Sequence, residues 1–407
     1  MSKKNDDFFK EKKEWSLTKD AILGCYLKPY FQKLIAFGKP ICYVDCFAGK
    51  GKFDDGKAGS PLIALDCINS SLENTRFDTN IYPYFIELNH SDSLKINVSN
   101  FLKEKPNARL NPQIVPGKFE DKIDSILRQH SGSTVFLYVD PYGIKALNIN
   151  KFNDFKLNDG KSVEMLINFN TWGFFREACR VLGADFKIDD ETKNYLVEYD
   201  PNNDLNREEL NVIAGGNYWE QIVLDYKNNL INPNEAELRL SNGISKAFNN
   251  KYQYVLNVPI KSKENNKVPK YRLYHLTNHT DGCLLMAENM FKRINEAKEN
   301  MRRGQMSLFE TDTEGDFIDP KEIKKNIYSC LRDCNEHLNQ FLCRLYTEYG
   351  LIDTRSNLND YITQLEKENK LVIEREPKKT KIGKKTTFMS EGKGKSVYIR
   401  SYKNENN

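Results

Sequence analysis

The sequence has no long apolar run and no leader-like start. Its 407 residues contain no stretch near the roughly 20 apolar residues that a membrane-spanning helix needs. The opening MSKKNDDFFKEKKEW lacks the apolar centre of a secretory signal. Nine cysteines occur without paired spacing, which in a chain that is not exported indicates reduced thiols. We therefore expect a cytoplasmic protein that does not enter a membrane.

Metal-binding patterns are also scarce. The spacing Cys330-x3-Cys334-x8-Cys343 matches neither the paired cysteines of zinc sites nor a C-x3-C-x2-C iron–sulfur pattern. We expect Cys330 and Cys334 one turn apart on a helix, Cys343 on the next helix, and all three as structural thiols. His275 and His279 fit a strand end and a turn better than a metal site. No metal is therefore expected.

Charge is small overall but unevenly distributed. The chain carries a net charge of +4, whereas residues 377–403 hold eight Lys, one Arg and one Glu, so the rest carries about −4. A basic end on a mildly acidic body predicts binding to a polyanion, although a solvated loop is the alternative. The candidate nucleic-acid contacts are Lys378, Lys379, Lys381, Lys384, Lys385 and, upstream of them, Arg355.

The first three quarters of the chain have the pattern of an α/β fold. Residues 15–37 have helical apolar spacing, with Thr18 as a possible N-cap. Buried parallel strands are expected at 41–47, 82–87, 112–116, 134–140 and 163–169, and helices at 60–68, 91–102 and 119–129. This alternation predicts a doubly wound sheet with right-handed crossovers.

The sheet is expected to end in an antiparallel hairpin. Residues 252–260 and 271–278 read as its two strands, and a periodic helix follows at 282–303. Such a hairpin closes the sheet of class I S-adenosylmethionine (SAM) methyltransferases and argues against a purely parallel dinucleotide-binding sheet. Residues 185–250 read as a helical insertion.

The C-terminal quarter predicts a separate domain. Helical patterns at 321–335, 337–348 and 358–370 precede two strands, 371–376 and 396–402, that flank the basic stretch. Helices followed by a hairpin with a basic tip resemble a winged helix-turn-helix, whose third helix would read bases near Arg355, Ser356 and Asn357. The expected organisation is an N-terminal helix (1–40), a methyltransferase-like domain (41–304), a linker (305–319) and a winged-helix-like domain (320–407).

A glycine turn follows the first predicted strand. In DCFAGKG (45–51), glycines let the backbone approach a ligand closely, and Gly59-Ser60-Pro61 can start the next helix. A dinucleotide fingerprint requires G-x-G-x-x-G, but in this chain Asp54 stands at the position of the third glycine. Its carboxylate would repel a bound pyrophosphate. We therefore expect SAM, with a plain βα turn as the alternative. The candidate cofactor residues here are Asp45, Phe47, Ala48, Gly49, Gly51 and Ser60.

Further candidate contacts stand at the ends of later strands. Glu87 ends the second strand, where a carboxylate can accept from both ribose hydroxyls of an adenosine. After the third strand, Lys118 holds the position expected for an acid facing the adenine, and Glu120 could substitute for it.

The fourth strand ends at Asp140-Pro141-Tyr142. Amino-methylating enzymes carry an Asp/Asn-Pro-Pro-aromatic turn here, and one proline is missing from this chain. Asp140 could orient an acceptor amine or act as general base, and Tyr142 could stack on a base. A turn acid that caps the next segment is the alternative. No Pro-Cys dipeptide occurs, which disfavours cytosine C5 methylation.

Several motifs together resemble the three-Cys-motif partner protein family, a bacterial and phage group with a SAM-dependent methyltransferase fold. The resemblance covers roughly residues 8–300 and rests on Trp15-Ser16, Lys19, YVDCFAGKGKF (43–53), GSP (59–61), YFIELN (84–89), YVDPYGIKAL (138–147), MLINFN (165–170) and YHLTNHTDGCLLMAENM (274–290). Lys50 departs from the proline common in the family. The resemblance implies association with an iron–sulfur, radical-SAM-like protein.

Two functions are compatible with these patterns. The first is a SAM-dependent methyltransferase that acts on an amine or hydroxyl of DNA or RNA. The second is a non-catalytic nucleic-acid-binding partner of the iron–sulfur protein, in which the SAM fold serves for docking or sensing.

Overall fold

The structure of the protein, a computed structural model, describes residues 9–155, 162–186, 204–249, 251–261, 269–304 and 318–402. Most of the predicted linker (305–319) and the residues 187–203 of the predicted insertion lie outside these ranges. No helix within the described ranges combines the length and apolar character needed to span a bilayer.

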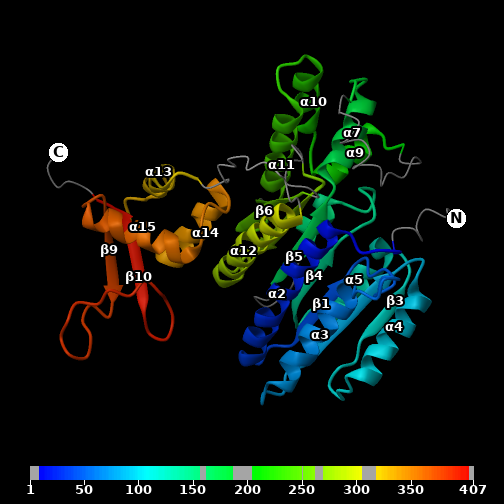
Figure 1. Ribbon diagram of the computed structural model, residues 1–407, viewed down its shortest axis with the longest axis horizontal. Helices are drawn as coiled ribbons and strands as arrows, with labels where there is room; N and C mark the ends of the chain where they lie inside the picture. Colours follow the sequence, from blue (N-terminus) through cyan, green and yellow to red (C-terminus); the bar gives the residue numbers. More distant parts are fainter. Residues whose placement is uncertain are drawn as a thin grey trace.

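The main body is a Rossmann-like α/β unit built on a seven-stranded sheet (Figure 1). Its strands are β1 (Ile41–Asp45), β2 (Ile81–Glu87), β3 (Gln113–Pro116), β4 (Thr134–Val139), β5 (Val163–Phe169), β6 (Tyr254–Ile260) and β7 (Tyr271–Thr277). The order across the sheet is β3-β2-β1-β4-β5-β7-β6. The first five strands are parallel, and β7 is antiparallel to both β5 and β6. The predicted parallel core and closing hairpin are therefore confirmed.

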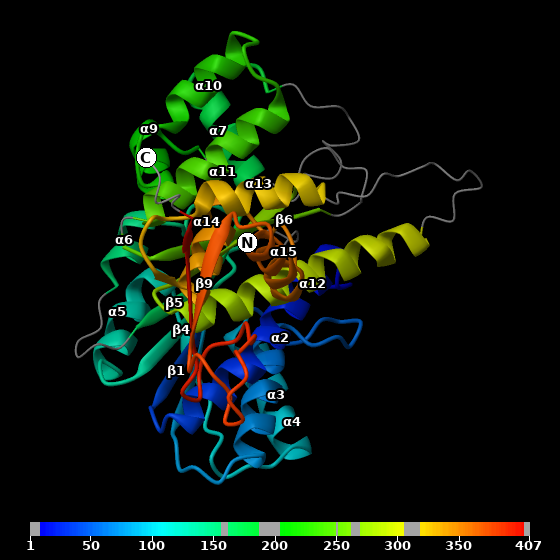
Figure 2. The same cartoon turned by 90° about the vertical axis from the view of Figure 1, so that its left-hand side faces the viewer.

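Helices cover both faces of this sheet (Figures 1 and 2). On one face lie α2 (Glu14–Ala36), α3 (Ser60–Glu73), α4 (Ser91–Glu104) and α12 (Thr280–Gly304). On the other face lie α5 (Phe119–Gln129), α6 (Ile149–Asp154), α7 (Thr171–Val181), α9 (Arg207–Ala214), α10 (Trp219–Lys227) and α11 (Pro233–Asn249). The fully buried residues of β1, β4 and β5 explain why these strands are continuous apolar runs: each is covered on two sides.

The predicted N-cap of the first helix is wrong, whereas the predicted start of the next helix at residue 60 is confirmed. Helix α2 begins at Glu14 and its N-cap, Lys13, makes no side-chain cap, so Thr18 lies inside the helix. Helix α3 begins at Ser60 itself, with Gly59 in extended conformation as N-cap. The predicted apolar face of α2 is nevertheless buried, and it forms one core with the sheet.

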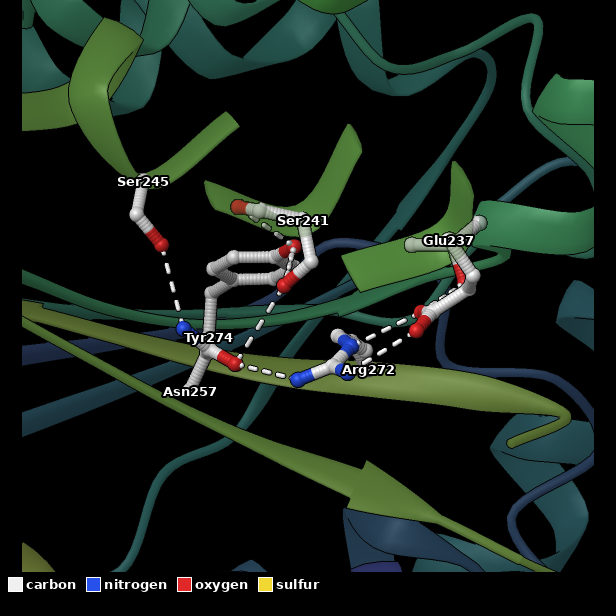
Figure 3. Close-up of polar contacts among 7 residues, drawn as sticks. Glu237, Ser241, Ser245, Asn257, Arg272 and Tyr274 are labelled. Carbon is white, nitrogen blue, oxygen red and sulfur yellow. Dashed lines mark hydrogen bonds and ion pairs between the residues drawn. The ribbon is translucent and has the colours of Figure 1, made fainter. Parts of the chain in front are cut away.

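A buried polar network joins the insertion to the sheet (Figure 3). Arg272 at the start of β7 makes two hydrogen bonds with the Glu237 carboxylate of α11, at 2.7 and 2.8 Å, and a third with Asn257 of β6 at 2.7 Å. Tyr274 donates to the Ser241 hydroxyl at 3.1 Å. Because Glu237 is only 2% exposed, this ion pair fixes α11 against the hairpin with its charges compensated.

The C-terminal part combines three helices with a small antiparallel sheet. Its elements are α13 (Pro320–Cys330), β8 (Glu336–His337), α14 (Leu338–Tyr349), α15 (Arg355–Lys367), β9 (Leu371–Glu376) and β10 (Ser396–Ser401). The strand order is β8-β10-β9. Helix α14 packs on α12 and β6, and the Cys343 thiol lies 3.4 Å from the Thr280 carbonyl oxygen.

The predicted helix 321–335 is too long, because α13 ends at Cys330. Cys334 therefore lies outside any helix and is exposed, whereas Cys330 and Cys343 are buried. The expectation of one helical turn between Cys330 and Cys334 is wrong. Within the described ranges, no group of three or more His, Cys, Asp and Glu side chains is arranged to hold a metal ion.

Candidate functional site

The predicted site residues gather at the carboxyl edge of the parallel strands. Parallel strands end at the same edge of a sheet, and open α/β sheets bind ligands there, where the strand order reverses. The reversal in this sheet lies between β1 and β4. Asp45 ends β1, Glu87 ends β2 and Asp140 follows β4, so the edge carries three carboxylates from neighbouring strands.

The glycine turn is held against the neighbouring strand by its own backbone. Ala48 N–H donates to the Ile86 carbonyl at 3.0 Å, and Gly49 N–H donates to Glu87 Oε2 at 2.7 Å. Gly49 and Gly51 have φ values of +63° and +79°, in the region that favours glycine. A Cβ on Gly51 would also lie 2.8 Å from a Leu94 methyl carbon. The turn therefore requires glycine at both positions.

Asp45 is a buried acid whose second oxygen has no partner. Its side chain is 0% exposed, Oδ1 accepts from Phe47 N–H at 3.3 Å, and Oδ2 has no hydrogen-bond partner among the described residues. Burial raises the pKa of Asp45 to about 7, the nearby Ser60 hydroxyl and the Phe47 N–H lower it, and the charges of Asp140 and Glu87 raise it further. An unpartnered acceptor at this edge fits a cationic or hydrogen-bond-donating ligand group.

Most acceptor positions of the Glu87 carboxylate already have backbone donors. Its Oε1 accepts from Asn89 N–H at 2.8 Å and from His90 N–H at 3.0 Å, and its Oε2 accepts from Gly49 N–H. A carboxylate offers about four acceptor positions, so about one remains. Contact with both ribose hydroxyls would require the loss of one backbone bond. The structure thus gives Glu87 the role of positioning the glycine turn and leaves room for one further donor.

Asp140 is surrounded by donors. Lys19 Nζ lies 3.0 Å from Oδ1 and 2.8 Å from Oδ2, Asn168 Nδ2 donates to Oδ1 at 2.7 Å, and Tyr138 OH donates to Oδ2 at 3.2 Å. The Lys19 side chain is only 7% exposed, so this pair is shielded from solvent. Asp140 can accept from an acceptor amine or act as general base only after one of these donors moves. Pro141 is half-buried and Tyr142 is exposed beside it.

Sequence reasoning missed the contribution of the N-terminal segment to the site. The Phe9 ring would lie 3.1 Å from a Cβ on Gly49, and it makes an edge contact with His90 at 5.1 Å between ring centroids. Lys12 Nζ donates to the Ala58 carbonyl at 2.6 Å and pairs with Asp20. Residues 9–13 are therefore docked on the loop that carries the glycine turn.

The remaining cofactor candidates divide into two groups. Phe47 packs its ring on Phe119 at 5.4 Å, Ala48 is buried, and Ser60 lies beside Asp45. Glu120 is exposed in the first turn of α5, where its carbonyl accepts from Lys151 at 2.9 Å. Ala48 is buried, and Phe47 and Ser60 are half-buried, whereas Glu120 lies on the surface.

The candidate nucleic-acid residues lie in the C-terminal part. All five predicted lysines, Lys378, Lys379, Lys381, Lys384 and Lys385, are exposed. Arg355 is half-buried and donates to Asn339 Oδ1 at 2.7 Å, and the Asn357 side chain donates to Asp353 at 2.8 Å. The start of α15 is thus engaged in internal contacts, and the exposed positive charge belongs to the loop between β9 and β10.

A separate hollow of about 460 Å³ lies between α5, α6 and α9, lined in part by Asp124, Asn148, Lys151 and Val212. It contains none of the predicted site residues. Comparisons of the chain with protein-family models, with curated proteins and with solved structures gave no match. The fold and the site geometry therefore define a Rossmann-like α/β protein with an acidic carboxyl edge, and the resemblance to the three-Cys-motif partner family stays a prediction.

Proposed function

We propose that the protein is a SAM-dependent methyltransferase that acts on an amine or hydroxyl of a nucleic acid. The observation that carries the proposal is the unpartnered, buried Asp45 Oδ2 beside a glycine turn that Glu87 holds in place. The sheet order, with its antiparallel β7, supports a methyltransferase over a dinucleotide-binding enzyme. When bound, SAM would supply an electrophilic methyl group.

The chain's own residues have distinct roles in this proposal. Asp45 accepts from the ligand's amino group, and the glycine turn permits close approach of its backbone. Glu87 orients the turn and accepts one ribose hydroxyl. Asp140 orients the acceptor amine or hydroxyl once it has exchanged a donor, and Lys19 holds its carboxylate in place until then.

One observation favours the second function, a non-catalytic nucleic-acid-binding partner of an iron–sulfur, radical-SAM-like protein. The four donor contacts to Asp140 fill the acceptor positions that a methyl acceptor would need. If Lys19 stays paired in the presence of substrate, the site binds a ligand without turnover.

The C-terminal part supports the nucleic-acid component of the proposal. The succession α13, β8, α14, α15, β9 and β10 with a three-stranded antiparallel sheet is compatible with the proposed winged helix-turn-helix, in which the β9–β10 connection would be the wing. Its exposed lysines supply the phosphate contacts that dominate affinity for nucleic acids.

The deciding experiment measures binding and turnover together. The full chain is incubated with methyl-labelled SAM and with duplex DNA, RNA or cell extract, and SAM binding is measured by calorimetry. We expect labelled nucleic acid from the wild type, SAM binding without label from Asp140→Asn, and weakened SAM binding from Asp45→Asn. The matched control is Asp78→Asn, an exposed acid in the loop before β2, which should behave as wild type. Binding without label in every fraction supports the second function, and no SAM binding refutes both.

A further inference from the structure

The loop between β9 and β10 contains a short, ordered arm. We call residues Lys378–Lys385 the basic arm. Lys379 and Lys385 pair in an antiparallel bridge, Thr380 N–H donates to the Lys384 carbonyl at 2.7 Å, and Lys384 N–H donates to Thr380 Oγ1 at 3.2 Å. Gly383 has a φ of +78°, which the tight turn requires. The arm is therefore a miniature hairpin with a defined tip.

The base of the arm is closed by one buried residue. Thr386 is 6% exposed, its hydroxyl donates to the Pro377 carbonyl at 2.7 Å, and its N–H donates to the Lys378 carbonyl at 3.1 Å. Arg375 donates to the Phe388 carbonyl at 3.0 Å and pairs with Glu366. These contacts tie both ends of the arm to the domain.

The second half of the loop is tied back in the same way. Glu391 accepts from Asn339 N–H at 3.1 Å and from Val397 N–H at 3.2 Å, and it lies 2.9 Å from His337 Nδ1. Figure 1 shows the connection between β9 and β10 projecting beyond the ends of these strands. The bridge between Gly392 and Lys395 closes a second projecting turn, and the arm differs from it by the apolar residue at its tip.

The tip of the arm is apolar although its flanks are basic. Ile382 is 79% exposed, the highest value among the large exposed apolar side chains of the described residues. Lys381 precedes it and Lys384 follows one glycine later, so charge surrounds a single branched apolar side chain. Lysines at these positions can contact phosphates, but phosphate contacts do not account for an exposed isoleucine.

We propose that the basic arm enters the minor groove of duplex DNA, where Ile382 inserts as a wedge at a base step and the lysines contact the flanking phosphates. This proposal rests on the nucleic-acid component of the proposed function and names its partner. Isoleucine is among the side chains that wedge base steps from the minor groove, and the resulting kink exposes more backbone to adjacent cations. Pyrimidine–purine steps such as TA unstack most easily, so the arm should prefer them.

Duplex DNA fits these features better than RNA or a membrane. The minor groove of B-DNA is narrow and deep enough to enclose a small tip, whereas that of A-form RNA is wide and shallow. Stable membrane attachment needs a larger apolar contribution than one side chain. Within Lys378–Lys385, Ile382 is the single large apolar residue.

The test uses the full chain and a 25-base-pair duplex labelled at both ends, with one central TA step or with G·C pairs in its place. Affinity is measured by anisotropy and bending by energy transfer. We expect Ile382→Ser to weaken binding to the TA duplex about tenfold and to abolish its bend, with an unchanged salt slope. Ile382→Leu should keep both properties, because leucine is also a wedging side chain. Lys381→Ala should lower the log–log salt slope by about 0.9.

The outcomes separate the two proposals. If Ile382→Ser binds and bends both duplexes as the wild type does, the wedge is refuted while nucleic-acid binding stands. If the full chain binds RNA or vesicles of anionic lipid in an Ile382-dependent way and ignores duplex DNA, the partner named here is wrong. If no nucleic acid binds at all, the nucleic-acid component of the proposed function fails and the wedge fails with it. Because Ile382 is exposed, neither variant should disturb folding.

Discussion

Replacing Asp45 with asparagine tests the electrostatic state of the site directly. Asp45 is fully buried, its Oδ2 lacks a partner, and burial is the main reason why its pKa rises to about 7. An ordinary aspartate has a pKa of about 3.9, so the difference corresponds to at most about 4 kcal/mol between the two protonation states. Asparagine has nearly the same shape and keeps an acceptor for Phe47 N–H, but it never ionises.

The sign of the pH effect follows from the raised pKa. Below about pH 4, Asp45 is protonated in both the folded and the unfolded chain. The wild type and Asp45→Asn should therefore have nearly equal free energies of unfolding there. Between pH 4 and pH 7 the unfolded chain loses this proton while the folded chain keeps it, so the wild type loses stability as pH rises. Asp45→Asn should therefore be more stable than the wild type at pH 8, by up to about 4 kcal/mol.

The assay is urea unfolding at several pH values, followed by tryptophan fluorescence. Trp172 and Trp219 are buried in the core that packs on β1, so they report on the body that contains Asp45. Asp78→Asn is the control, because Asp78 is exposed and its replacement should shift stability little at any pH. A difference between Asp45→Asn and wild type that stays constant from pH 5 to pH 8 would show that Asp45 remains ionised when folded, and the argument for a neutral buried acid would be wrong.

Three further outcomes are expected. Glu237→Gln leaves Arg272 buried without its counter-charge and should destabilise the protein by about 3 kcal/mol, with faster amide exchange in α11. Gly51→Ala should lower thermal stability more than Gly56→Ala, by about 1–2 kcal/mol, because both have positive φ but only Gly51 meets Leu94. SAM and S-adenosylhomocysteine carry the same amino group, so calorimetry should show both binding about tenfold more tightly at pH 8 than at pH 6, as Asp45 ionises; affinities that do not change with pH contradict this.

Local patterns were sufficient to predict most of the main body. Strand β5 is a run of seven buried residues, and no other local structure accommodates such a run between turn signals as well as a central strand does. The insertion was predicted to be helical from its polar sequence with scattered aromatic residues, and α9, α10 and α11 confirm helices there within the described residues. Short helix α6 and helix α7 were missed, because α6 has only six residues and α7 directly follows β5.

The misplaced elements depend on partners distant in sequence. Strand β8 has two residues and exists through pairing of His337 with Tyr398 and Glu336 with Ile399. Helix α13 ends at Cys330, ahead of this strand, although the sequence of residues 331–335 continues the helical pattern. The early start of α2 has a similar origin, since Lys12 is held by Ala58 and Asp20 just ahead of it.

In the candidate site too, local patterns identify the strand-end residues but not their partners distant in sequence. Asp45, Gly49, Glu87 and Asp140 were identified because each stands at a strand end, a position that periodicity reveals. The contact of Lys19 with Asp140 joins residues 121 positions apart, and no local pattern predicts it. It also changes the chemistry, because a predicted free base becomes one half of a shielded ion pair.

These pairings bear on which ligand the edge can accept. One of its three acids, Asp140, has a lysine partner, Lys19. The partners of Asp45 and Glu87 are instead neutral N–H and hydroxyl donors, and burial keeps Asp45 partly protonated near pH 7. A ligand that carries a cation can replace that proton, whereas a pyrophosphate would add negative charge beside Glu87 and raise the free energy of the bound state. The charge balance therefore supports a sulfonium nucleoside over a dinucleotide.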